Sequence, residues 1–530
     1  MDPYDYVIVG AGSAGCVLAN RLSADPDKRT LLIEAGGNDN NLMLHIPAGW
    51  ATNFRNPKVD WGYNTQPEPG LNNRSIYWPR GKVLGGSSSI NGMVYVRGVA
   101  LDFERWAQSG ATGWGYDEVL PYFRKAEAQQ RVDDEFHGLD GPLYVEDVRD
   151  KRAPMDAFVE GMVEIGIPRN DDFNGADQAG GGYYQFNQHA GRRWSTATAY
   201  LDPVKRRSNL DLITGALVRR VLFDGKVVSG LEVARNGGVL ENVRARQVIL
   251  CGGAINSPQL LELSGIGGGE LLQRLGINVV HDLPEVGENL QDHVMTKAVY
   301  GTHADQSINR EVQGWRLLPT AMKWLFLRRG PLTTGSAPVG GFWYSRDGLE
   351  APDLQIHFAS GATLYNSEGR IRPMPIPAMT AVVNQSRPES VGSIHIDGIE
   401  PGQPPLIQAN YLDSEVDRQT LIRGLRMIVG IFETEAMGAM VTGRLAPDVD
   451  MSSDDELLEY IRNDASTTFH PTSTCRIGSV VDANLRVQGV AGLSVADASV
   501  MPYVVSGNTN AATIMIAEKA ADLFLAAEGS

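Results

Sequence analysis

The sequence predicts an α/β (α+β) fold with two interwoven domains. Residues 6–36 alternate strand, glycine-rich turn, helix and strand, which indicates a parallel, Rossmann-like sheet. Residues 209–250 contain short strands separated by turn residues, a pattern typical of a β-meander. Residues 298–400 mix further strands with a helix near 313–328. The last pattern predicts a second domain built on an antiparallel sheet flanked by helices.

The N-terminal segment defines the first sheet. Residues 6–9 are an apolar run typical of a buried strand, and residues 14–23 have the composition of a helix. A second apolar run, residues 30–33, ends on Glu34. The order strand, turn, helix and strand predicts two neighbouring parallel strands joined by a crossover helix.

The turn in this segment indicates a dinucleotide site. Gly10, Gly12 and Gly15 have the GxGxxG spacing, and Glu34 follows Gly15 by 19 residues. The three glycines allow a tight turn, a close approach of a pyrophosphate and helix–strand packing. The phosphates would lie on free N–H groups at the positive end of the helix, and Glu34 can accept hydrogen bonds from a ribose.

The remaining elements follow from periodicity. Apolar residues at helical spacing predict a helix over 413–435 that is capped by Asp413 or Ser414 and serves for packing. The strands LDLIT, ALVRRVLF, VVSGLEVA and RQVILCG form the meander and return to a buried strand, Val248–Cys251. The short segments DLQIHF, TAVVNQ and GSIHID are predicted strands of the second domain. Further helices are expected over 113–128, 154–165 and 508–525.

Composition excludes several classes of function. The chain has 530 residues and a formal net charge of −16, which disfavours nucleic acids and anionic surfaces as partners. Its three cysteines lack CxxC spacing, so we expect buried thiols, no disulfide framework and no metal site. The first strand begins within about five residues of Met1 and no apolar run reaches about 20 residues, so we expect neither signal peptide nor membrane span.

Two further segments are rich in glycine. Residues 252–263 pass from a buried strand through Gly252 and Gly253 into a helix, which makes either a second ligand-binding turn or a packing turn. Residues 80–98, RGKVLGGSSSINGMVYVRG, are neither a linker nor a periodic element. Their backbone N–H groups are candidates for lining a flat polar ring.

These blocks resemble the glucose–methanol–choline (GMC) oxidoreductases, in particular their bacterial choline-dehydrogenase-like and alcohol-dehydrogenase branch. The resemblance rests on residues 6–36, RGKVLGGSSSINGMVYVRG, GAINSPQLLELSGIG, TFHPTSTCRIG and VADASVMPYVVSGNTNAATIMIAEKAADL, and therefore covers nearly the whole chain. It implies FAD as the cofactor. Some relatives attach FAD through a histidine, but this chain has Ile90 there, so we expect non-covalent FAD.

The resemblance also assigns site residues. The cofactor-binding residues that it implies are Gly10, Gly12, Ser13, Ala14, Gly15, Glu34, Ala35, Val83, Ser87, Asn91, Gly92, Met93, Val94, Val218, Asp497, Ala498, Asn508 and Thr509. It further implies a cofactor domain of residues 1–150, 195–297 and 450–530, and a substrate domain of residues 151–194 and 298–449.

His470 is the candidate catalytic base, because oxidation of an alcohol removes a proton from oxygen and a hydride from carbon. Without the resemblance, the simpler interpretation of His470 is an ordinary core or surface histidine. The resemblance favours its role as the catalytic base. Its expected partner is Asn508, which also suits a helix N-cap, and Asn510 is the rival. His293 and Arg476 are interpreted as structural.

The predicted function is FAD-dependent oxidation of an alcohol CH–OH group, with a quinone, an electron carrier or an artificial acceptor taking the electrons. An oxidase that uses O₂ is the first alternative, a flavin-containing lyase or photoenzyme the second, and a redox-inert flavoprotein the third. We expect a cytoplasmic enzyme, with peripheral contact to the inner membrane left open. Four aromatic residues are candidates for the wall of the substrate pocket, although each could equally belong to the hydrophobic core: Phe342, Trp343, Phe358 and Phe469.

Overall fold

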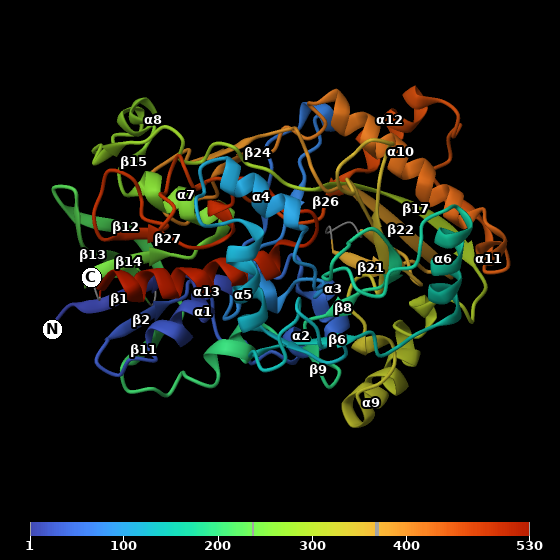
Figure 1. Ribbon diagram of the computed structural model, residues 1–530, viewed down its shortest axis with the longest axis horizontal. Coiled ribbons are helices and arrows are strands. Elements are labelled where there is room, and N and C mark those ends of the chain that lie inside the picture. Colours follow the sequence, from blue (N-terminus) through green and yellow to red (C-terminus); the bar gives the residue numbers. More distant parts are fainter. Residues whose placement is uncertain (1, 236–237, 366–369, 529–530) are drawn as a thin grey trace.

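The computed structural model describes residues 2–235, 238–365 and 370–528. Two seven-stranded sheets lie toward opposite ends of the long axis of the molecule (Figure 1). Each sheet is covered by its own buried hydrophobic cluster. The mixed α/β fold with a Rossmann-like half and an antiparallel half is confirmed.

The first sheet has the strand order β11-β2-β1-β14-β13-β12, with β27 beside β14. Val7 and Ile8 of β1 are fully buried, as expected for an apolar run inside a parallel sheet. The strands of this sheet are β1 (Tyr4–Val9), β2 (Thr30–Ile33), β11 (Leu210–Ile213), β12 (Ala216–Asp224), β13 (Val227–Arg235), β14 (Val239–Leu250) and β27 (Leu493–Val495).

The long strand β14 joins two kinds of pairing. Its first half pairs antiparallel with β13, and its second half pairs parallel with β1 and β27. The predicted meander is therefore confirmed for β12 to β14. The expectation that residues 210–213 belong to it is wrong, because β11 pairs parallel with β2 at the opposite edge.

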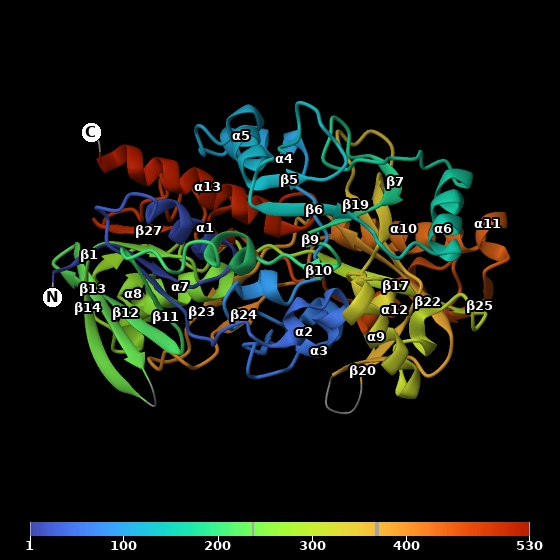
Figure 2. The same ribbon diagram turned by 90° about the horizontal axis from the view of Figure 1, so that it is seen from below.

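Helices α1 (Ser13–Leu22) and α13 (Thr509–Glu528) pack side by side on the first sheet (Figures 1 and 2). Helix α7 (Gly253–Leu263) begins at the second glycine-rich junction. The other helices near this half are α4 (Ala100–Gln108), α5 (Tyr116–Ala126) and α8 (Gly269–Arg274). All three cysteines are buried and free.

The second sheet is antiparallel, in the order β25-β17-β22-β19-β18-β7 with β26 beside β17. Its strands are β7 (Gly180–Tyr183), β17 (Val294–Thr302), β18 (Val339–Trp343), β19 (Leu354–Ala359), β22 (Ala378–Gln385), β25 (Val441–Ala446) and β26 (Ser466–Thr467). Since β26 comes from a segment assigned above to the cofactor domain, the domain limits stay a prediction.

Helix α10 (Glu415–Phe432) packs on this sheet, and its N-cap is Ser414, whose hydroxyl accepts from the Val416 N–H. The predicted packing helix is thus confirmed, with Ser414 rather than Asp413 as the cap. Other helices of this half are α6 (Ala153–Glu164), α9 (Leu317–Leu327), α11 (Glu435–Gly438) and α12 (Asp454–Asp464). No helix among the described ranges has the length and apolarity needed to cross a bilayer.

Short elements connect the two halves. The predicted strand at 392–397 forms a separate pair, β23 (Ser393–His395) with β24 (Leu406–Gln408), outside the large sheet. Residues 38–80, expected to be loop, contain the short helices α2 (Leu42–His45) and α3 (Trp50–Asn53). The remaining short strands are β3 (Tyr63–Asn64), β4 (Tyr77–Trp78), β5 (Glu127–Gln129), β6 (Leu143–Asp147), β8 (Gln185–Phe186), β9 (Gln188–His189), β10 (Arg192–Arg193), β15 (Ile266–Gly267), β16 (His281–Asp282), β20 (Thr363–Tyr365) and β21 (Ile371–Pro373).

Candidate active site

A cavity of about 830 Å³ receives residues from both halves of the molecule. His470 lines it. Of the predicted cofactor residues, those that line it are Gly10, Gly12, Ser13, Ala14, Glu34, Ala35, Ser87, Asn91, Gly92, Met93, Val94, Val218, Asp497, Ala498, Asn508 and Thr509. Gly15 and Val83 do not line it. The structure therefore brings together nearly all residues that the sequence singled out over a span of 500 positions.

The three glycines of the first turn have different surroundings. Gly10 has φ +101°, a conformation that side chains rarely adopt. A Cβ on Gly15 would lie 1.8 Å from the Gly10 carbonyl oxygen, so α1 packs directly on the turn. A Cβ on Gly12 would meet nothing closer than 4.0 Å and would only narrow the cavity. Gly10 thus allows the tight turn, Gly15 the close packing of the helix, and Gly12 the open approach that a pyrophosphate requires.

The first turn of α1 is suited to an anion. Its N-cap is Gly12, no side chain caps it, and the first turn contains no acidic residue. The first N–H groups therefore keep their hydrogen-bonding capacity and the positive end of the helix dipole faces the cavity.

Glu34 is buried at the end of β2. Its two carboxylate oxygens accept from the Ala11 N–H (2.9 Å) and the Gly36 N–H (2.8 Å). Burial raises the pKa of Glu34 to about 7, against the lowering effect of these two donors. Each oxygen keeps a free lone pair, so Glu34 can both tie the turn together and accept from a ribose hydroxyl.

A buried arginine, Arg193, organises the 80–98 segment. It donates to the Ser88 carbonyl, to Asn91 Oδ1 and to the Asn91 carbonyl at 2.7–3.1 Å. Burial lowers the pKa of Arg193 to about 9. Asn91 Oδ1 also accepts from the Met93 N–H, and Met93 has φ +67°. The fixed turn holds Asn91, Gly92, Met93 and Val94 along the cavity wall.

Two hydrophobic residues of this segment differ in position. Val83 is fully buried in a small cluster with Leu44, Val59 and Ile90, so it supports the wall from behind. Ile90 is 2% exposed and also lines the cavity. Its hydrocarbon side chain has no atom that can bond covalently to a cofactor.

The second glycine-rich junction is tied to Asp497. Asp497 Oδ2 accepts from the Gly253 N–H (2.8 Å) and Ser257 Oγ (2.6 Å), and Oδ1 accepts from Ser499. This carboxylate thus joins the start of α7 to the segment that follows β27. It lines the same cavity, and so do Gly252 and Gly253.

The backbone around His470 is held by two charged residues. The His470 N–H donates to Asp292 Oδ1 (2.7 Å), and the other oxygen of this buried carboxylate accepts from Tyr411 and Thr467. Arg80 Nη2 donates to the Phe469 carbonyl at 2.7 Å. Phe469 has φ +69°, and these contacts hold it in that conformation.

The His470 ring contacts three side chains. Nδ1 lies 3.0 Å from His293 Nδ1 and 3.0 Å from Thr468 Oγ1, while Nε2 lies 3.2 Å from Asn508 Nδ2. His293 Nε2 lies 3.1 Å from the Ser386 carbonyl, which can only accept. His293 Nε2 therefore carries the hydrogen, His293 Nδ1 accepts, and His470 Nδ1–H donates to it. His470 Nε2 therefore carries no hydrogen, and its lone pair accepts from the Asn508 Nδ2–H group on the cavity side.

Both histidines are neutral near pH 7. Burial lowers the pKa of His470 well below its usual 6.5, and His293, His357 and Arg80 lower it further. Burial likewise lowers the pKa of His293 to about 4. A buried neutral imidazole whose cavity-facing nitrogen carries no hydrogen is a suitable proton acceptor.

Asn508 and Asn510 are separated by the start of α13. Asn508 lies beside His470, and its Oδ1 accepts from Gln355 Nε2 (3.1 Å), which orients its amide N–H group toward the imidazole. Asn510 Oδ1 accepts from Ser13 Oγ (2.7 Å) at the first turn of α1. The geometry thus gives the His470 contact to Asn508 and gives Asn510 a different one.

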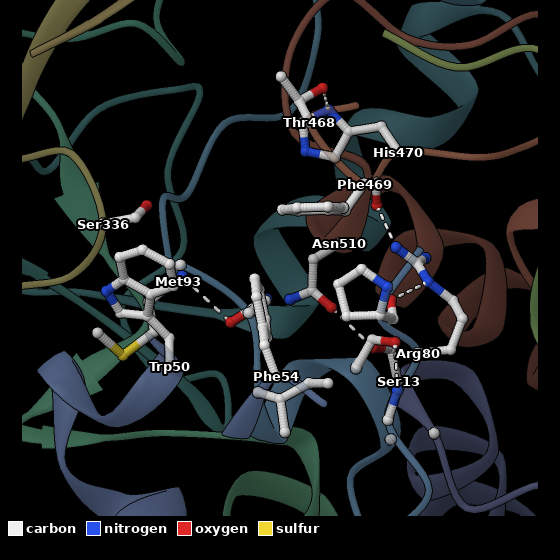
Figure 3. A pocket seen from close by; sticks show the side chains of 18 of the residues that line it. Ser13, Trp50, Phe54, Arg80, Met93, Ser336, Thr468, Phe469, His470 and Asn510 are labelled. Carbon is white, nitrogen blue, oxygen red and sulfur yellow. Dashed lines mark hydrogen bonds between the residues drawn. The ribbon is translucent and has the colours of Figure 1, made fainter. Parts of the chain in front are cut away.

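Aromatic rings line the cavity beside His470 (Figure 3). Phe54 lies between Trp50 and Phe469, with ring centroids 5.6 and 5.3 Å away, and Trp61 adds a further ring. Of the four aromatics proposed from sequence, Phe358 and Phe469 line the cavity. Phe342 and Trp343 do not and pack in the hydrophobic core.

Several residues of this site were not predicted from the sequence. His293 contacts His470 although we interpreted it as structural, and Asp292, Arg193 and Trp50 were not considered. His293 ends the segment NLQDH, residues 289–293, but it is separated from His470 by 177 positions, so no local sequence pattern indicates their contact. Arg476 pairs with Glu285 (3.1 Å) and does not line the cavity.

A charged cluster lies elsewhere. Ligand-type atoms of Asp134, His137 and Asp172 come within 4.8 Å of one another, a grouping that spacing alone did not reveal. His137 is hydrogen-bonded to both Glu127 (3.0 Å) and Asp172 (2.9 Å). Burial opposes protonation, but these hydrogen bonds raise the pKa of His137 to about 9. His137 is therefore an imidazolium that fills the space between the carboxylates.

Comparison with known proteins identifies the family. The profile described as "GMC oxidoreductase" matches residues 4–295 with its N-terminal part and residues 388–517 with its C-terminal part. The chain belongs to the GMC oxidoreductase family. It is accordingly an FAD-dependent oxidoreductase that acts on alcohols.

Individual relatives agree over nearly the full chain. The alcohol dehydrogenase [acceptor] of Pseudomonas putida is 42% identical over 98% of this chain and 96% of its own. The oxygen-dependent choline dehydrogenase of Pseudomonas aeruginosa (strain LESB58) is 43% identical over 98% and 94%. Among solved structures, pyridoxine 4-oxidase from Mesorbium loti has a TM-score of 0.89 at 32% identity, covering 99% of each chain. A formate oxidase has a TM-score of 0.92 at 26% identity, covering 100% of this chain and 99% of its own.

Proposed function

We propose that this GMC oxidoreductase is a dehydrogenase for uncharged, largely apolar primary alcohols, with His470 as the catalytic base and Asn508 as its partner. The observation that carries the catalytic part is the single tautomer of His470, whose unprotonated Nε2 faces the cavity beside the Asn508 amide. The electrons pass to an acceptor other than O₂, as the name of the Pseudomonas putida relative implies for that protein.

His470 Nε2 removes the hydroxyl proton of the alcohol and becomes an imidazolium. Once Nε2 carries that proton it no longer accepts from the Asn508 amide N–H group, 3.2 Å away, and this group donates to the alcohol oxygen as negative charge develops there. Bound FAD would supply the acceptor for the hydride that leaves the carbinol carbon. The hydrogen bonds from His470 to His293 and from His293 to the Ser386 carbonyl end on a group that cannot take a proton. His293 therefore orients His470 and does not conduct the proton onward.

The residues around the cavity fit FAD. The uncapped start of α1 and the open Gly12 position would hold the pyrophosphate, and Glu34 the ribose. Val218 and residues 91–94 line the same cavity, and we infer that Val218 would contact the adenine and residues 91–94 the flavin. With Ile90 in place of a histidine, we propose that FAD is held without a covalent bond.

The charges of the cavity support an uncharged substrate. Among the described residues that line it, the only carboxylates are Glu34 and Asp497, and hydrogen bonds commit both to the backbone turns of the cofactor side. The cations that line it are Arg80, Lys297 and Arg372. A quaternary ammonium alcohol would lose its hydration there without gaining a carboxylate partner.

The apolar walls support a hydrophobic substrate. Side chains from the second half, from α9 and from the 43–61 segment contribute Met43, Trp50, Phe54, Met295, Leu317, Leu332, Phe358 and Phe469. Burial of an alkyl or aryl chain against such a wall gains about 0.8 kcal/mol per CH₂ group.

A panel of alcohols, mixed anaerobically with the flavin-loaded enzyme, tests this assignment. We expect 1-octanol and benzyl alcohol to bleach the flavin, with kcat/KM roughly tenfold or more above that for choline. 1-Hexanol against 1-octanol serves as the matched pair for chain length. A higher kcat/KM for choline would contradict the substrate class, and peroxide formed in air at the turnover rate would make the enzyme an oxidase.

A further inference from the structure

Helix α9 presents an apolar stripe to solvent. Trp315, in the turn before α9, is 79% exposed, and Leu318 and Phe326 are each 69% exposed. Met322 and Leu325 are 47% and 49% exposed. Positions 318, 322, 325 and 326 lie on one side of a helix, where a surface helix ordinarily carries polar residues. We call these five residues the α9 patch.

The orientation of α9 is fixed by its opposite side. Trp324 is 2% exposed, and its indole N–H donates to the Gly191 carbonyl at 2.9 Å. Thr320 is also buried, and Leu317 and Ala321 line the active-site cavity. The α9 patch is therefore the outward face of a docked helix, which projects at the edge of the molecule (Figures 1 and 2).

The charge around the α9 patch is opposite to that of the chain as a whole. The chain carries −16, yet residues 312–346 contain no Asp or Glu. The same stretch contains Arg316, Lys323, Arg328 and Arg329 within or beside α9. The preceding acid, Glu311, is paired with Arg152. An exposed apolar face thus has a cationic rim on an acidic protein.

We propose that the α9 patch docks this enzyme onto the surface of an anionic lipid bilayer. An apolar helix face with tryptophan and flanking Lys or Arg is the arrangement that lies in the membrane interface. The cationic rim complements lipid phosphates, while the remaining negative charge, beyond a Debye length of about 10 Å at 0.1 M salt, is screened. A second copy would bring two cationic rims together, which disfavours self-association through this face.

Docking through α9 would place a wall of the cavity at the bilayer, because Leu317 and Ala321 of the same helix line it. The proposal itself rests on the surface of α9 and holds whichever alcohol is oxidised. If the substrate assignment fails, the docking proposal still stands, and if the docking proposal fails, the substrate assignment still stands.

Co-sedimentation of the holoenzyme with vesicles tests the proposal. We expect binding to phosphatidylcholine vesicles that contain about 30% phosphatidylglycerol, and roughly tenfold weaker binding to phosphatidylcholine alone. The L318E/F326E double variant is expected to bind the mixed vesicles roughly tenfold or more weakly than wild type. Neither residue lines the cavity, so bleaching by a dissolved alcohol should be unchanged.

The matched control is V239E/L240E on β14, where two residues are 66% and 55% exposed far along the chain from α9. This variant should bind the mixed vesicles like wild type, and flavin absorbance and melting temperature verify that both variants are folded. The proposal is overturned if wild type does not sediment with the mixed vesicles, or if L318E/F326E sediments as well as the control. It is equally overturned if wild type is a dimer that L318E/F326E converts to a monomer, which would assign the α9 patch to a second copy.

Discussion

His470 is held in one tautomer by hydrogen bonds to His293 and Thr468, both of which accept from its Nδ1–H. The Ser386 carbonyl fixes the hydrogen of His293 on Nε2, so that His293 Nδ1 accepts from His470 Nδ1–H. Thr468 Oγ1 donates to the His293 carbonyl and offers its lone pair to the same hydrogen. Two residues therefore point the basic nitrogen of His470 toward Asn508 and the cavity.

Removal of His293 should impair this orientation. We expect His293→Ala to lower the rate of anaerobic flavin reduction about tenfold with little change in KM, because Thr468 still accepts from Nδ1–H. The H293A/T468V double variant should lose considerably more. The exposed His303, changed to alanine, is the control, and flavin content normalises each rate. An unchanged rate in the double variant would show that the ring needs neither partner.

The pH profile should reflect the lowered pKa of His470. A base must be neutral to act, and burial keeps His470 neutral as the pH falls through 6.5. The kcat/KM for a neutral alcohol should therefore be flat from pH 8 down through 6.5 and fall only in more acidic solution. An acidic limb centred at or above pH 6.5 would be at odds with a base in this environment.

At the scale of elements, the junction of β1, its glycine turn and α1 was predictable from sequence. The hydrophobic pattern of residues 6–33, the glycine spacing and the position of Glu34 are local signals. The structure has the strand, helix and strand that these signals predict. The position of β11 was not predictable, because a four-residue apolar strand does not encode its partner in a sheet. The aromatic wall from residues 50–61 was missed for a similar reason: its short helices lack a full period.

The packing contact of Gly15 provides an element-scale prediction. Gly15→Ala places a methyl group 1.8 Å from the Gly10 carbonyl, which forces α1 away from the turn. We expect the variant to lose bound FAD and several degrees of melting temperature. Gly37→Ala is the control, since a Cβ there would meet nothing within 4 Å. Full FAD content in Gly15→Ala would show that the turn tolerates the displacement.

At the scale of the whole molecule, one cavity joins the nucleotide turn near the N-terminus to the base near the C-terminus. The resemblance to the family led to His470 and Asn508, whereas composition and spacing left an ordinary histidine as the simpler interpretation. The residues that support the base could not be inferred, because Asp292 and His293 are brought to His470 by long-range contacts that include the pairing of β17 and β26. Long-range contacts of this kind leave no periodic signal.

The central claim is that His470 takes the proton of the alcohol, and single-turnover flavin reduction tests it most directly. Flavin-loaded wild type and His470→Ala are mixed anaerobically with 1-octanol, and the loss of yellow absorbance is followed. We expect the variant to retain FAD but to be reduced roughly 10²–10⁴-fold more slowly. Reduction of His470→Ala at the wild-type rate would contradict the base assignment, and product formation by wild type without any bleaching would indicate a lyase.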